Sequence, residues 1–255
     1  MYKNYGPLAA QVYELTKPVG NMLNGDIDYY CERLQGIKGK ILEAGVGTGR
    51  MLIPLLQEGY QIEGIDQSHD MLTICQNNLA KYQLQTAIYQ GDLATFELLT
   101  RYDAIIMPTA TFCLIETEEL ASQALINCYQ HLSPGGRLII DLDLPFYPEA
   151  GETETSTYRL SSHKGITLER KVIEIDWLAQ HVLTHVRYEE WQDGVLISTE
   201  LQRLLLRWYG LTELRLILEK VGFESITISA DYDYLVPPVD SNQTITFEAT
   251  KKGID

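Results

Sequence analysis

Short apolar runs alternate with stretches of helical periodicity between about residues 38 and 143. Several of these runs are apolar at nearly every position; they lie at 40–44, 61–66, 86–90, 102–107 and 137–143. Runs of this kind predict strands that are buried on both faces of a parallel sheet.

The stretches between the runs predict helices at 50–58, 70–82 and 118–132. Gly59 marks the end of the first helix, and the Ser-Pro-Gly-Gly turn at 133–136 stops the last one and starts the next strand. This regular alternation predicts a doubly wound α/β sheet with right-handed crossovers.

The pattern changes after residue 150, where longer and partly alternating segments predict an antiparallel β insertion. Asp193-Gly194 is the signal for a hairpin between its last two strands. The four strands are expected at 152–160, 166–176, 181–191 and 195–208.

Both ends of the chain also carry recognisable elements. A helix at 212–221, which Gly222 ends, and two strands at 225–230 and 244–250 follow the insertion. The first 36 residues read as helical, with breaks near the Pro-Val-Gly triplet at 18–20 and at Asn24-Gly25.

Composition and charge narrow the class of protein. The 255 residues are 45% hydrophobic and 22% charged, as in ordinary globular proteins. The formal net charge of −15 comes from 35 acidic and 20 basic residues, and the basic residues form no cluster that would grip a phosphate backbone. We therefore expect no nucleic-acid partner.

The expected cellular compartment follows from features that are absent from the sequence. No stretch approaches the roughly 18 uncharged apolar residues that cross a bilayer, and the N-terminus has no secretion-signal pattern. The four cysteines are far apart and form no C-x-x-C pair, which favours reduced thiols over a disulfide or a zinc site. We expect a cytoplasmic protein with no membrane partner and no metal.

The most informative segment is the glycine-rich stretch that follows the first expected strand and opens a helix. It reads Glu43-Ala-Gly45-Val-Gly47-Thr-Gly49-Arg50. Glycines at this spacing allow a tight turn and let backbone N–H groups approach a ligand without a Cβ in the way.

Two acidic residues stand at later strand ends. Asp66 lies 21 residues beyond Gly45, where a carboxylate can accept both hydroxyls of a ribose. Asp92 follows the third strand, where it can receive the exocyclic amine of adenine while Leu93 packs on the ring. Taken singly, Asp66 could cap the following helix and Asp92 could be a turn residue, but the three features together are far more specific.

These residues resemble the E/D-x-G-x-G-x-G motif of class I S-adenosylmethionine-dependent methyltransferases, and the resemblance covers roughly residues 38 to 143. It implies a Rossmann-like, mostly parallel seven-stranded sheet with S-adenosylmethionine as the cofactor. Carried over, the glycine loop with Glu43 would hold the methionine part, Asp66 the ribose, and Gln67, Asp92 and Leu93 the adenine. Met107 would lie near the methionine moiety.

The insertion is similar to that of small-molecule methyltransferases, including the aminosugar N,N-dimethyltransferases. A nicotinamide dehydrogenase is the first rival, but its third glycine would come one residue later, and no Tyr-x-x-x-Lys pair is present. The expected reaction is an in-line displacement that moves a methyl group to a small-molecule amine or hydroxyl.

The acceptor is less well defined by the sequence. The segment after the fourth strand lacks the Asp/Asn-Pro-Pro-aromatic motif of many nucleobase methyltransferases. Asp141 and Asp143 suggest either a metal site or an ordinary strand end. His131, His181 and His185 read as structural or surface residues, so no catalytic residue is assigned.

We divide the chain into a helical lid at 1–37, a cofactor-binding core at 38–150, an insertion at 151–208 for acceptor or dimer contacts, and a closing segment at 209–255. Tyr5 and Tyr13 are lid residues, and Tyr13 is expected at the cofactor. The expected acceptor residues are Tyr5, Phe112, Tyr158, Arg159 and Trp177.

Two hypotheses remain at this point. The first is a methyltransferase, with inserted strands that could also pair across a two-fold axis in a homodimer. The second is a non-catalytic module that binds S-adenosylmethionine or S-adenosylhomocysteine, because fold alone does not establish catalysis.

Overall fold

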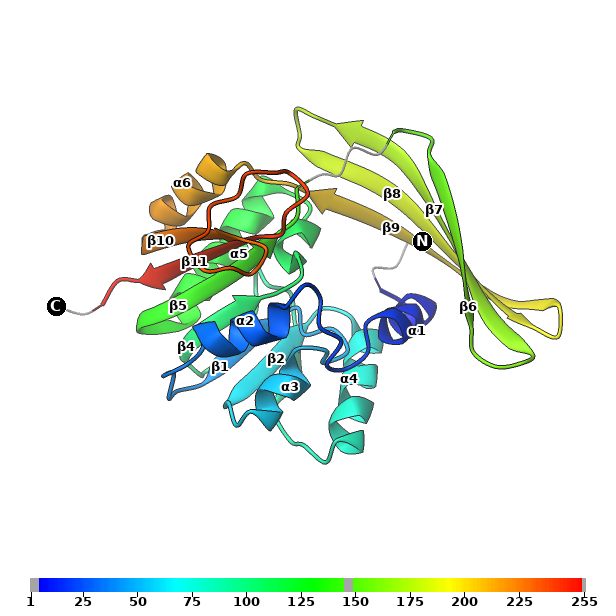
Figure 1. The fold of residues 1–255 in the computed structure, drawn as a ribbon, viewed down its shortest axis with the longest axis horizontal. Coiled ribbons are helices and arrows are strands. Elements are labelled where there is room, and N and C mark those ends of the chain that lie inside the picture. The colour runs from blue at the N-terminus through cyan, green and yellow to red at the C-terminus, as the bar shows by residue number, and fades with distance from the viewer. Residues whose placement is uncertain (1–4, 145–148, 254–255) are drawn as a thin grey trace.

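The computed structural model describes residues 5–144 and 149–253. Its core is a seven-stranded sheet in the order β10-β11-β5-β4-β1-β2-β3 (Figure 1). Among these strands β11 alone runs against the others, since it is antiparallel to both β5 and β10. The strands are β1 (Ile41–Ala44), β2 (Ile62–Asp66), β3 (Ile88–Gln90), β4 (Tyr102–Met107), β5 (Leu132–Leu142), β10 (Phe223–Ala230) and β11 (Ile245–Lys251).

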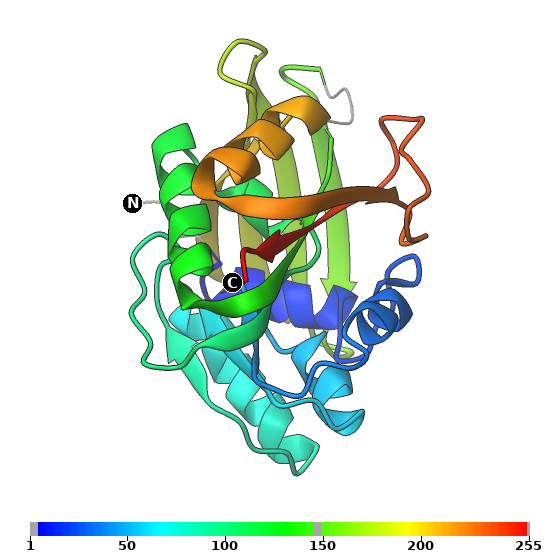
Figure 2. The ribbon, with the colours of Figure 1, turned by 90° about the vertical axis from the view of Figure 1, so that its left-hand side faces the viewer.

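Apolar side chains on both faces explain why the core strands lack polar alternation. In β4, Ile105 and Met107 belong to one buried cluster, whereas Ala104 and Ile106 belong to the other. Helices α5 (Glu118–His131) and α6 (Leu211–Val221) cover the first face, as the view turned by 90° shows (Figure 2). The second face is covered by α2 (Asp26–Arg33), α3 (Leu52–Gln57) and α4 (His69–Lys81).

Strand β5 begins earlier than the sequence predicts. It starts at Leu132, which pairs with Tyr102, and the pairing with β4 shifts register before it resumes at Arg137. The expected turn at 133–136 therefore lies within the strand as an irregularity, and Gly135 takes a positive φ of 76° there.

The insertion forms a separate antiparallel sheet in the order β6-β7-β8-β9, which we call the inserted sheet. Its strands are β6 (Thr153–Arg159), β7 (Lys164–Asp176), β8 (His181–Gln192) and β9 (Val195–Arg207). The expected hairpin joins β8 to β9: Asp193 and Gly194 have φ angles of 50° and 79°, as a type I′ turn requires. The expected fold class, a Rossmann-like sheet with an antiparallel β insertion, is confirmed.

Helix α1 (Pro7–Thr16) lies between α4 and the inserted sheet (Figure 1). The sequence breaks at 18–20 and 24–25 separate it from α2, and Asn24 and Gly25 take left-handed φ angles of 53° and 89°. None of the described helices has both the length and the apolar character needed to span a membrane.

Candidate active site

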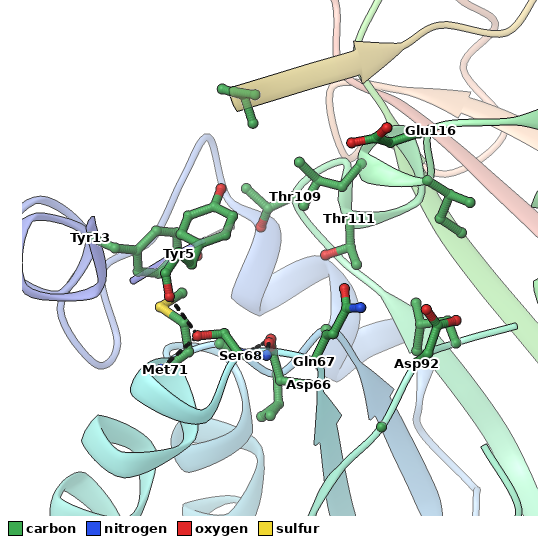
Figure 3. A pocket seen from close by; sticks show the side chains of 18 of the residues that line it. Tyr5, Tyr13, Asp66, Gln67, Ser68, Met71, Asp92, Thr109, Thr111 and Glu116 are labelled. Carbon is green, nitrogen blue, oxygen red and sulfur yellow. Dashed lines mark hydrogen bonds between the residues drawn. The ribbon is translucent and has the colours of Figure 1, made fainter. Parts of the chain in front are cut away.

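A cavity of about 600 Å³ lies at the carboxyl ends of β1, β2 and β4. The core strands form its floor, strand β9 of the inserted sheet lies above it, and the segment around α1 lies at its side (Figure 3). Ligands of open α/β sheets bind at this edge, outside the carboxyl ends of the strands.

The glycine loop forms one wall of the cavity and needs its glycines for two reasons. Gly45 and Gly47 have φ angles of 83° and 55°, which side chains rarely adopt. In addition, a Cβ on Gly45 would collide with the Thr111 side chain, and a Cβ on Gly47 would lie 3.2 Å from Met71 Cε. The loop therefore exposes backbone to the cavity.

Glu43 is a buried carboxyl group that faces this cavity from the end of β1. Its side chain belongs to a residue that is only 2% exposed, and Oε2 has no hydrogen-bond partner. Burial raises the pKa of Glu43 to about 8, although the nearby Arg50 acts in the opposite direction. A buried acceptor of this kind favours a ligand that brings a cationic donor.

Asp66 connects the glycine loop to the end of β2. Its Oδ2 accepts a hydrogen bond from Gly47 N at 2.8 Å, and its Oδ1 accepts one from Ser68 N at 2.8 Å. Ser68, not Asp66, caps helix α4, because its hydroxyl accepts from Met71 N. Two fixed oxygens at the cavity wall suit a ribose diol.

The far end of the cavity is bounded by Gln67, Asp92 and Leu93. Asp92 Oδ1 accepts a hydrogen bond from Ala94 N at 2.8 Å, so the residue shapes a turn and also lines the cavity. Polar edges next to an apolar side chain provide a surface for a flat ring.

Two cations near the glycine loop were not expected from the sequence. Arg50 is 3% exposed and pairs with Asp26 at 2.6 Å, while it donates to Thr109 Oγ1 at 2.7 Å. Lys17 lines the cavity and stands 5.2 Å from the ring centre of Tyr13. Burial and the charge of Arg50 lower the pKa of Lys17. The only sequence signal for Arg50 was its place directly after Gly49.

Two tyrosines from the N-terminal segment close the cavity over the glycine loop. The rings of Tyr5 and Tyr13 meet edge to face, with their centres 6.1 Å apart (Figure 3). Burial raises the pKa of both phenols. They therefore stay protonated near neutral pH and serve as neutral hydrogen-bonding groups.

The loop after β4 supplies two threonines to the cavity, and Asp141 holds it in place. Thr109 and Ala110 have φ angles of 57° and 56°, a conformation that needs support. Asp141, which is fully buried at the end of β5, accepts from Thr109 N and from Tyr232 OH at 2.9 Å each. Burial raises the pKa of Asp141 to about 6. Asp141 thus supports the cavity wall without lining it.

The side of the cavity away from the glycine loop is built from β9 and from residues after the short helix η1 (Thr111–Leu114). Arg203 Nη1 donates to Glu116 Oε1 at 2.7 Å and so joins the inserted sheet to the core. Gln202, which is 2% exposed, also reaches the cavity. No sequence pattern pointed to these residues.

The cavity brings together most of the expected cofactor residues, but several expected site residues lie elsewhere. Gly49 packs beside Cys75, and Met107 is fully buried in the core because its side chain points to the α5 face. These two and the acceptor residues other than Tyr5 do not line the cavity; the latter are Phe112, Tyr158, Arg159 and Trp177.

Each of these four expected acceptor residues lies elsewhere in the structure. Phe112 is buried against Tyr209, with ring centres 5.0 Å apart, and Tyr158 packs on the cluster behind α1. Arg159 ends β6 on the surface, and Trp177 meets Trp208 edge to face at 5.3 Å.

The histidines and the acidic groups outside the cavity have their own settings. His131 Nε2 accepts from Leu98 N at 3.1 Å, and Nδ1 lies 2.9 Å from Asn127 O, so the ring ties α5 to the loop before β4. His181, Glu174 and Asp176 have ligand atoms within 4.8 Å of one another at the β7–β8 turn. None of these residues lines the cavity.

The fold is that of class I methyltransferase-type α/β domains, with a cavity at the carboxyl ends of its strands. A family model for a methyltransferase domain matches residues 41–136. Over these residues the chain resembles a methyltransferase domain, which agrees with the expected enzyme class, and the expected fold is confirmed.

The similarity of the chain to known proteins extends beyond residues 41–136. The cypemycin N-terminal methyltransferase of a Streptomyces species is 23% identical over 194 residues, which is 75% of each chain. The S-adenosylmethionine-dependent methyltransferase of Clostridium acetobutylicum has a TM-score of 0.74 at 16% identity and covers 96% of this chain and 98% of its own. The sugar N-methyltransferase KedS8 of a Streptoalloteichus species has a TM-score of 0.76 at 15% identity and covers 99% and 96%.

Proposed function

We propose that this protein moves a methyl group from S-adenosylmethionine to the nitrogen of a small-molecule amine. The observation that carries the donor part is Glu43, a buried carboxyl group with an unpartnered oxygen in the cavity wall. An ammonium group placed there would supply the missing donor.

The other parts of the cavity fit the rest of the donor. Lys17 offers a positive charge for the methionine carboxylate, because Arg50 is already paired with Asp26. Asp66 would accept the ribose hydroxyls, and Gln67, Asp92 and Leu93 would surround the adenine. Tyr13 would cover the methionine part.

When bound, the donor supplies a methyl group on a positively charged sulfur. The chain then has to align the acceptor nitrogen with that methyl group and exclude water, and orientation alone can lower the barrier by roughly 7–11 kcal/mol. Tyr5, Tyr13 and Thr109 stand around the space between the glycine loop and β9 and would orient the acceptor (Figure 3).

An amine is favoured over a hydroxyl by the groups available as bases. An amine that arrives unprotonated needs little help, whereas a hydroxyl requires a positioned base. Among the described residues that line the cavity there is no histidine, and the raised pKa values of Tyr5 and Tyr13 make them poor bases. KedS8 is itself described as a sugar N-methyltransferase.

The remaining partner and compartment assignments are part of the same proposal. The net charge of −15 disfavours nucleic acid, and three of the four free cysteines are buried, which suits a reducing cytoplasm. We also propose a homodimer through the inserted sheet, which light scattering across a concentration series would test.

The decisive experiment has two stages. Calorimetry with S-adenosylmethionine, S-adenosylhomocysteine and NAD should give binding of the first two and none of NAD; loss of binding in both would remove the donor assignment. Transfer of labelled methyl to a panel of aminosugars, N-terminal peptides and their hydroxyl counterparts then separates the enzyme from a binding module. Labelling of amines alone supports the proposal, and labelling of hydroxyls alone overturns its acceptor part.

A further inference from the structure

The apolar face of α1 packs on the inserted sheet, not on the two clusters of the core. Leu8, Ala9 and Val12 are at most 8% exposed and share a buried cluster with Ile166, Leu168, Val186 and Tyr188 from β7 and β8. Helix α1 comes early in the chain and the sheet more than a hundred residues later. The two nevertheless form one packed unit.

Glu200 on β9 fixes the beginning of this helix. Its Oε2 accepts a hydrogen bond from Leu8 N at 2.9 Å, in the first turn of α1. The helix has no side-chain cap of its own, since Gly6 stands at its N-cap position. A carboxylate at a helix N-terminus satisfies a free N–H group and interacts favourably with the helix dipole.

Gly6 makes this close approach sterically allowed. A Cβ at Gly6 would lie 2.7 Å from Glu200 Cδ, so any side chain there would displace the carboxylate. The position of Glu200 and the absence of a side chain at residue 6 therefore belong to the same contact.

Helix α1 and the residues just before it also contact helix α4 of the core, beside the proposed donor site, and two hydrogen bonds join them there. Ser68 Oγ donates to Tyr5 O at 2.7 Å, directly after Asp66 and Gln67 in the chain. Asn78 Nδ2 donates to Glu14 Oε1 at 3.1 Å. The inserted sheet thus provides most of the apolar support for α1, and the core provides hydrogen bonds.

We propose that the inserted sheet supports α1 as the helix that covers the donor. Glu200 is then the positioning residue that holds α1, with Tyr5 and Tyr13, over the donor. This inference rests on the proposed donor site. It gives the insertion a role besides acceptor or dimer contacts.

The same face of β9 connects the contact between Glu200 and α1 with the acceptor side of the cavity. Gln202, two residues beyond Glu200, lines the cavity and accepts a hydrogen bond from Tyr188 OH at 3.0 Å. Tyr188 belongs to the cluster that supports α1. An acceptor that contacts Gln202 therefore contacts the same strand, β9, that positions α1.

The test compares Glu200→Ala and Glu200→Gln with the matched control Glu169→Gln, whose carboxylate lies on β7 and pairs with Arg187 at 3.3 Å. Loss of a helix cap changes an equilibrium by roughly 5- to 30-fold. Because a ligand that needs the closed state binds in proportion to the population of that state, the Kd of S-adenosylmethionine should rise measurably in Glu200→Ala, by at most that factor. Glu200→Gln keeps an acceptor oxygen and should recover part of the affinity.

Hydrogen exchange of the donor-free proteins provides the second measurement. Amides of residues 8–16 should exchange about 5- to 30-fold faster in Glu200→Ala, with the core strands unchanged. Glu169→Gln should match the wild type in both measurements.

Unchanged hydrogen exchange of α1 in Glu200→Ala would overturn the proposal that the inserted sheet holds this helix through Glu200. Faster exchange with an unchanged Kd of S-adenosylmethionine would overturn the positioning role of Glu200. If the wild type itself fails to bind S-adenosylmethionine, the proposed function fails, whereas the exchange measurement still decides the role of Glu200 in holding α1. Should Glu200→Ala not fold, Glu200→Gln carries both measurements.

Discussion

The two sides of the cavity are built in different ways. On the side proposed for the donor, polar groups lie at or near the ends of buried core strands: Glu43 is the last but one residue of β1, Asp66 ends β2, and Asp92 comes just after β3. On the acceptor side, Gln202 and Arg203 lie within a strand of the inserted sheet, and Glu116 lies in a loop. The donor side is therefore set by the topology of one sheet, whereas the acceptor side depends on how two sheets pack.

The strongest test of this contrast is Glu43→Gln, which removes the charge that would meet the donor ammonium. Leaving a buried ion without its partner costs about 3–5 kcal/mol, so donor affinity should fall at least about 100-fold. At pH 7 the free protein should unfold at a higher temperature, because Glu43 ionises in the unfolded chain but is held neutral in the folded protein by a pKa of about 8, a penalty that the amide does not carry. Calorimetry and thermal unfolding check the two parts; donor affinity within threefold of wild type would contradict the Glu43 assignment.

Asp66→Ala tests the second strand end. The substitution removes charge-assisted hydrogen bonds worth roughly 1.5–3 kcal/mol, so the Kd of S-adenosylmethionine should rise about 10- to 100-fold. Part of this loss comes through Gly47, whose N–H donates to Asp66. Adenosine binding separates the two contributions, since adenosine keeps the ribose and the adenine but lacks the methionine part that would meet the glycine loop. A folded variant with unchanged affinity for both ligands would remove the ribose assignment.

The pH dependence of S-adenosylmethionine binding provides a further test of Glu43. Burial raises the pKa of Glu43 to about 8, and pairing with an ammonium requires the ionised form. Binding below pH 8 should therefore release a proton, and affinity should fall about tenfold per pH unit between pH 8 and 6. Calorimetry in buffers of different ionisation enthalpy measures the released proton, and a flat profile in the wild type would contradict the expectation.

The same raised pKa has the opposite consequence for the donor-free protein. The contribution of neutral Glu43 to stability is fully present below the unfolded pKa of about 4.5 and is lost as pH rises toward 8. Glu43→Gln should remove both pH dependences, which makes it the control for the measurement above.

The smallest effect is expected on the far side of the inserted sheet. Arg159 is exposed at the end of β6 and does not line the cavity, so Arg159→Ala should change stability by no more than about 0.5 kcal/mol. Steady-state kinetics with an accepted amine should stay within twofold of wild type. A tenfold rise in the acceptor KM would instead mean that the acceptor extends along β6.

The core could be predicted from sequence because its patterns are local. Strand β4 was predicted with its observed ends, since a run buried on both faces is bounded where the polar residues begin. The start of β5 was not, because Leu132 pairs with Tyr102 across an irregularity that only the neighbouring strand defines.

The cavity residues at the strand ends could be predicted for the same reason, and those on the opposite wall could not. Asp66 and Asp92 were expected from their places at strand ends, and Glu43 from the resemblance of the glycine motif; all three line the cavity. Phe112 and Tyr158 were expected in the acceptor site because aromatic residues suit pockets, but both are used for packing, against Tyr209 and behind α1. Gln202 and Arg203 depend on the placement of β9, which no local pattern encodes.

The shared cluster of α1 and the inserted sheet has a consequence for how such chains diversify. The insertion leaves the core after β5 and returns before α6, which would make it a convenient unit of exchange between relatives. Yet Leu8, Ala9 and Val12 are shaped to its inner face, and Gly6 to its Glu200. A recombination that replaced the insertion alone would leave the first helix mismatched, so new acceptor specificity has to be inherited in two distant pieces of the gene.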